Sequence, residues 1–299
     1  MSIFALLAIS FAASLGGGIF SKLCSNAVVG RSVGRYAVFM AVNGVIACVF
    51  FYVSGGFRLE LNLPTLIYAV IYAVIVLLSL VGNTVALKYI NIAALTVIMN
   101  ALGLVATSAM GAWIFGETVD ARRLLRIAIM LVSVVLFAAE GLMSSSGDNK
   151  KPRFSAKTVA IILVLLIANC GNTVVTKFYS RDSRVLSDNS FFFFTNVVLI
   201  AVNLLAIAIT LIKKRDELRE IKPLFRPLNI LELSGNTLCI NIGSLVSLLL
   251  LARMDVTVLS PLSSALGILV GFIGSLIFRE KMGWLSYIGV LGAIVAVII

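Results

Sequence analysis

The feature that most constrains this chain is a series of ten long apolar stretches separated by short polar segments. Most of them run for about 18–23 residues, and a helix of that length spans a hydrocarbon core of about 30 Å. Because that core holds no water to bond the backbone, each stretch must satisfy its own N–H and C=O groups, as a helix does. The stretches are Ile3–Ser21, Val33–Val53, Leu66–Leu87, Ala93–Phe115, Leu124–Met143, Thr158–Val175, Phe191–Ile212, Ile230–Leu251, Thr257–Phe278 and Trp284–Ile299.

Composition supports a membrane location. Hydrophobic residues make up 61% of the chain and charged residues 12%, against about 45–50% and 25% in soluble domains. Only four charged residues fall inside the stretches, all within a turn of an end: Arg35, Arg126, Glu140 and Glu232. The stretches lack the strict alternation of barrel strands. The sequence therefore predicts an all-α integral membrane protein with ten transmembrane helices, a multi-pass protein of the cell membrane whose partner is the lipid bilayer.

The net charge of +11 comes from residues between the stretches. Lys and Arg in that position favour contact with lipid headgroups, so we expect no nucleic-acid partner. The chain has no histidine, and its four cysteines are scattered without a metal-binding spacing. We therefore expect no metal, no cofactor and no catalytic residue.

An internal repeat defines the predicted domains. Residues 16–25 match residues 171–180 at an offset of 155, with Gly, Ser or Thr, Lys, a bulky residue and Ser in common. Residues 111–117 match residues 274–280 at an offset of 163, with Gly, Ile, Phe and Glu in common. Both matches join stretch n to stretch n+5. They predict a first five-helix repeat over residues 1–143, a polar linker over residues 144–157 and a second five-helix repeat over residues 158–299. Since five is odd, the two repeats are inverted in the membrane, which is typical of secondary transporters.

Several short motifs resemble the drug/metabolite transporter superfamily, in particular its ten-helix EamA-type branch. They are the Lys that closes stretches one and six, Arg35 at the start of stretch two, residues 87–90, residues 114–117 and Ser260-Pro261. The resemblance implies movement of a solute by alternating access, often export of amino acids or other metabolites. It also implies cytoplasmic termini, whereas the distribution of Lys and Arg favours termini on the other side.

Polar residues within the stretches are the candidates for solute binding. Asparagine is costly to bury in a membrane, and Asn169, Asn172 and Thr173 are spaced to share one helical face. A proline within a helix frees a backbone carbonyl for another partner. The predicted substrate-binding residues are Asn83, Asn100, Asn169, Asn172, Thr173, Asn241 and Pro261. Lys22 and Lys177 are equivalent in the two repeats and are predicted to gate the cavity or attract charge. The alternative for the asparagines is bonding between helices, and for the lysines it is snorkelling to headgroups.

The function predicted from the sequence is transport of a small molecule. No Asp or Glu lies in the middle of a stretch, which argues against a proton-coupled carrier of cationic drugs and favours a neutral, zwitterionic or anionic substrate. With few acid–base groups available, we expect the chain not to be an enzyme. The alternatives are a membrane-embedded lipid-modifying enzyme and a channel or structural subunit. The sequence is also compatible with a homodimer.

Overall fold

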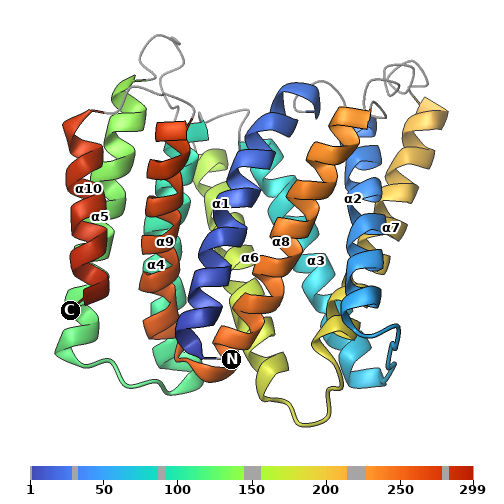
Figure 1. The fold of residues 1–299 in the computed structure, drawn as a ribbon, viewed down its shortest axis with the longest axis horizontal. Helices are drawn as coiled ribbons and strands as arrows, with labels where there is room; N and C mark the ends of the chain where they lie inside the picture. The colour runs from blue at the N-terminus through green and yellow to red at the C-terminus, as the bar shows by residue number, and fades with distance from the viewer. Residues whose placement is uncertain are drawn as a thin grey trace. The chain divides into compact units, whose positions relative to one another are not determined.

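The chain is helical throughout the residues that the computed structural model describes, which are 2–28, 33–86, 92–144, 156–213, 227–277 and 283–298. Within these ranges there are ten α-helices and no strand (Figure 1). They are α1 (Ile3–Val28), α2 (Val33–Ser54), α3 (Leu63–Ala86), α4 (Ile92–Phe115), α5 (Ala121–Ser144), α6 (Ala156–Arg181), α7 (Asp188–Lys213), α8 (Pro227–Arg253), α9 (Val256–Ile277) and α10 (Trp284–Ile298).

Six of these helices are long and apolar enough to cross a membrane: α1, α2, α6, α7, α8 and α9. Large apolar side chains such as Ile167 and Leu205 are exposed on them, which is the surface that lipid covers. The prediction of an all-helical membrane protein is thus confirmed, with six helices that are long and apolar enough to span a membrane. The predicted linker lies mostly outside the described residues, although α5 continues to Ser144 and α6 begins at Ala156.

Two helices, α3 and α5, begin before their apolar stretches because polar residues cap them. Asn62 accepts a hydrogen bond from the backbone N–H of Thr65 at 3.0 Å, so α3 begins at Leu63, three residues before the stretch. Asp120 accepts in the same way from the N–H of Arg123 at 2.8 Å, at the start of α5. Each cap satisfies an N–H that the first turn of the helix leaves without a partner.

The chain divides into two compact units that do not coincide with the two halves of the sequence. The first unit comprises Met1–Ala73 and Tyr179–Leu249, and the second comprises Val74–Phe178 and Leu250–Ile299. Each unit therefore draws helices from both predicted repeats. The boundaries fall within α3, within α8 and near the end of α6.

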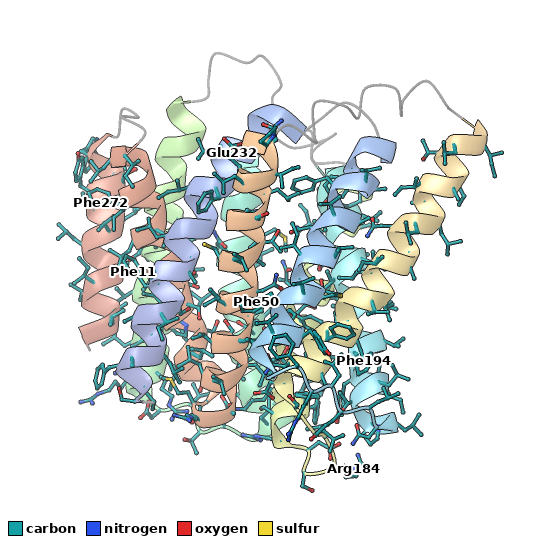
Figure 2. All side chains as sticks on the ribbon, turned by 45° about the vertical axis from the view of Figure 1, so that its right-hand side comes forward. Phe11, Phe50, Arg184, Phe194, Glu232 and Phe272 are labelled. Carbon is teal, nitrogen blue, oxygen red and sulfur yellow. The ribbon has the colours of Figure 1, made fainter. Side chains whose placement is uncertain are left out.

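The first unit is built on α2 and α7, which run antiparallel. Phe51 stacks on Phe192 with ring centroids 5.2 Å apart, and, further back along α2, Gly44 lies against Ile200 of α7. A Cβ on Gly44 would come within 2.6 Å of the Ile200 side chain, so only glycine permits this approach. Aromatic side chains fill the core at this end, where Figure 2 labels Phe50 on α2 and Phe194 on α7.

The connection between α6 and α7 closes the same unit. Asp182 accepts hydrogen bonds from the side chain of Arg184 at 2.9 and 2.7 Å, and Arg184 is labelled in this connection in Figure 2. These bonds, together with one from the backbone N–H of Arg184, hold the pKa of Asp182 well below its usual range. Asn62 donates to the Arg184 carbonyl at 2.6 Å, which joins this connection to the start of α3.

The second unit contains two further helix pairs, α4 with α9 and α5 with α10 (Figure 1). Its core includes Leu104, Met130, Ile268 and Ala293, one from each of the four helices. Gly292 of α10 lies so close to Ser133 of α5 that a Cβ there would overlap the serine hydroxyl.

Candidate functional site

A polar cluster lies between α2 and α8 in the first unit. The single O–H of Thr237 has two acceptors within reach, Oδ1 of Asn43 on α2 and the Leu233 carbonyl of its own helix at 2.8 Å. One turn further, Asn241 donates to the Thr237 carbonyl at 2.8 Å. Thr237 and Asn241 are buried. This cluster contains one predicted substrate-binding residue, Asn241, whose amide nitrogen is bonded within α8.

Asn236 is the unsatisfied member of this region. Only 6% of it is exposed, and its Oδ1 is buried without a hydrogen-bond partner among the described residues. Successive residues of a helix are about 100° apart, so Asn236 shares its arc of α8 with Ile240 and Ser247 rather than with Thr237. Ile240 and Ser247 are exposed. A buried carbonyl oxygen without a donor costs about 1–3 kcal/mol, and a bound donor group would recover that energy.

The predicted residues of α6 belong to the second unit. Asn169, Asn172 and Thr173 are all partly buried, on the arc of the helix that also carries Leu165. Leu165 packs with Ala86 of α3. Oδ1 of Asn172 is buried and has no hydrogen-bond partner in the part of the chain that the structure describes, so Asn172 provides a second unused acceptor there.

Lys177 caps the C-terminus of α8. It is 2% exposed, and its Nζ donates to the carbonyls of Leu251 and Met254, at 2.5 Å each. The last carbonyls of a helix carry partial negative charge, so an ammonium group is stabilised there. The buried lysine is therefore a structural cap in this conformation, and its predicted gating role stays a prediction.

Glu117 caps the start of α9, directly after the turn that Lys177 holds. Gly116 has φ of 63° and turns the chain so that Glu117 meets α9. The two carboxylate oxygens accept from the N–H groups of Val256 and Thr257 at 2.8 Å each. The neighbouring Arg123 pairs with Asp255 at 2.9 Å and leaves both carboxylate oxygens to these backbone groups.

The remaining predicted residues are placed as follows. Pro261 is buried within α9, next to Ser260, whose hydroxyl lies 2.6 Å from that of Thr107 on α4. Asn100 is exposed on α4. The side chains of Lys22 and Asn83 lie outside the described residues.

The described polar groups suit binding rather than acid–base chemistry. Lys177 and Glu117, the buried ionisable residues of the second unit, are both engaged by backbone groups. In the part of the chain that the structure describes, no group of three or more Cys, Asp or Glu side chains could hold a metal ion. Asn236 was not among the predicted substrate-binding residues. Its unpaired oxygen can be recognised only from the packing around it.

Comparison with known proteins establishes the fold alone. No protein-family model matches the chain, and no curated protein matches it either. Among solved structures, the chain is similar to a protein of known crystal structure with a TM-score of 0.71 and 15% sequence identity. The match covers 99% of this chain and 96% of the other, so the whole helical arrangement is one that occurs in another protein.

Proposed function

We propose that the chain is a secondary transporter of the cell membrane that moves a small metabolite by alternating access. Its ten helices would all cross the bilayer, as two inverted repeats of five helices over residues 1–143 and 158–299. This is the arrangement implied by the resemblance to EamA-type transporters.

The observation that carries the proposal is which helices pack together. Three pairs join helix n to helix n+5: α2 with α7, α4 with α9 and α5 with α10. In an inverted repeat, a half-turn about an axis in the membrane plane exchanges helix n with helix n+5. A helix that lies beside this axis therefore packs against its own equivalent. The pairs α4 with α5 and α9 with α10 also pack together, as the same exchange requires.

The register of these pairs supports the same symmetry. Gly44 and Ile200 meet 156 positions apart, and Ser133 and Gly292 meet 159 positions apart. The residues of Thr107 and Ser260, which share a hydrogen bond, are 153 positions apart. These separations are close to the offsets of 155 and 163 that relate the two halves of the sequence. In the proposed repeats, these three contacts would join near-equivalent residues.

The proposed solute-binding residue is Asn236 on α8. Its unused acceptor, Oδ1 of Asn236, would receive a hydrogen bond from an ammonium or hydroxyl group of the solute. Its side chain is an amide and not a carboxylate, so the proposed substrate is neutral, zwitterionic or anionic, and an amino acid is one candidate. Since a buried polar group discriminates against a ligand that cannot bond it, Asn236 would select solutes with a donor.

A thermal-shift screen of the purified protein against amino acids and other small metabolites tests this proposal. A ligand at 100 times its Kd stabilises the folded protein by about 2.7 kcal/mol. We expect a solute with a hydrogen-bond donor to raise Tm in the wild type and in the control variant Asn203→Leu. Among the described residues, the side chain of Asn203 donates to the Leu199 carbonyl of its own helix. Asn236→Leu should lose that rise. Absence of any stabilising solute, or an equal rise in both variants, would count against the proposal.

A further inference from the structure

The first turns of α5, in the second unit, carry three arginines, and one of them is already engaged. Arg123 donates to Asp255 at 2.9 Å, to Thr257 at 2.9 Å and to the Thr118 carbonyl at 2.6 Å. Arg126 lies one turn further along, and its Nε is buried with no hydrogen-bond partner among the described residues. Arg122 is exposed, four residues before Arg126 and therefore on the same side of the helix.

The acidic groups of this corner have other partners. Asp255 pairs with Arg123, Asp120 caps α5 and Glu117 caps α9. A guanidinium group that is partly withdrawn from water gains most from an anion that accepts two parallel hydrogen bonds, such as a carboxylate or a phosphate. Arg122 and Arg126 therefore form a positive site for which these acids provide no anion.

The surroundings of the site indicate a lipid. Trp113, at the end of α4, is 88% exposed, and exposed tryptophan is typical of the level at which hydrocarbon meets headgroups. Leu125 and Val132 are also exposed on α5. They follow Arg122 along one stripe of the helix, on either side of Ile129, which is partly buried and packs against the core of the unit. An acyl chain can lie along this stripe while its headgroup meets the arginines.

We propose that Arg122 and Arg126 bind the phosphate of an anionic phospholipid whose acyl chain lies along Leu125 and Val132. Both halves of the ligand are matched: the phosphate by two guanidinium groups and the hydrocarbon by an apolar stripe on the same helix. The site requires a membrane location for the chain but not transport activity.

The test measures the unfolding temperature of the full-length protein in a neutral detergent. The added probes are phosphatidylglycerol, phosphatidylcholine with the same acyl chains, and inorganic phosphate. We expect phosphatidylglycerol to stabilise the wild type more than phosphatidylcholine does, and inorganic phosphate to have no effect at the same concentration. In Arg126→Gln and Arg122→Gln the apparent affinity for phosphatidylglycerol should fall about tenfold, since each substitution removes charge-assisted hydrogen bonds.

Arg58→Gln is the matched control. It removes the same charge from an exposed arginine in the connection between α2 and α3, and it should keep the full response to phosphatidylglycerol. If Arg126→Gln does not fold, Arg122→Gln gives the decisive comparison. The proposal is wrong if the two lipids stabilise the wild type equally, if inorganic phosphate stabilises it as well as the lipid does, or if both α5 variants respond like Arg58→Gln.

Discussion

Replacing Glu117 by glutamine tests how the turn between α8 and α9 is held. Glu117 is 8% exposed, and its two oxygens accept from the N–H groups of Val256 and Thr257 at 2.8 Å each. Glutamine has nearly the same shape, but its single amide oxygen can accept from only one of these groups. Its NH2 group then faces the other N–H, so one buried donor is left unsatisfied.

The expected cost follows from two effects. Loss of a charge-assisted hydrogen bond costs about 1.5–3 kcal/mol, and loss of a negative charge at a helix N-terminus costs about 0.3–1 kcal/mol. Together they predict that Glu117→Gln lowers the free energy of unfolding by about 2–4 kcal/mol. At roughly 2 °C per kcal/mol for a large domain, Tm should fall by about 4–8 °C.

Intrinsic fluorescence of the purified protein during heating in detergent measures this change. Glu60→Gln is the control, because Glu60 is an exposed acid in the connection between α2 and α3. Its effect should stay within about 0.5 kcal/mol. If the two variants melt together, the carboxylate of Glu117 contributes nothing as a cap and the reasoning fails.

Three further predictions concern other parts of the chain. Lys177→Met should lower the free energy of unfolding by about 1–3 kcal/mol, because it leaves two buried carbonyls without their donor; chemical denaturation measures this, and an unchanged midpoint would contradict it. Gly44→Val should destabilise the contact of α2 with α7 by at least about 1–3 kcal/mol. Gly103→Ala is the control: among the described residues, an added Cβ there has no neighbour within 4 Å, so this variant should be neutral or slightly stabilised. Equal melting of the two variants would contradict the close approach of Gly44 to Ile200. Since Arg184 lowers the pKa of Asp182, the ionised carboxylate stabilises the connection between α6 and α7 above about pH 3.9, the unfolded value, and this contribution declines as pH falls further. Hydrogen exchange of residues 182–187, corrected for intrinsic rates, should therefore be faster at pH 2.5 than at pH 5, and Arg184→Gln should remove most of that difference.

The helices were predictable from the sequence because hydropathy alone identifies a segment that must satisfy its own backbone in lipid. All ten stretches correspond to helices of the structure. Their ends were less predictable, since caps such as Asn62 and Asp120 extend a helix beyond its apolar part.

The polar contacts were predicted less well because they join distant parts of the chain. The sequence places arginines a few residues from Glu117, but its partners are backbone groups about 140 positions later. Asn241 was expected to face a solute, yet its nitrogen bonds the carbonyl four residues earlier, as asparagine in any helix can. Only packing distinguishes it from Asn236, whose oxygen stays unsatisfied.

Solute counterflow is the most direct test of the proposed transporter. Liposomes that contain the protein are loaded with a high concentration of the unlabelled solute found by thermal shift, and a trace of labelled solute is added outside. A carrier that alternates between two faces predicts a transient accumulation of label above its equilibrium level, which Asn236→Leu diminishes and Asn203→Leu retains. Label that merely equilibrates, or that enters no faster than in protein-free liposomes, would contradict the account.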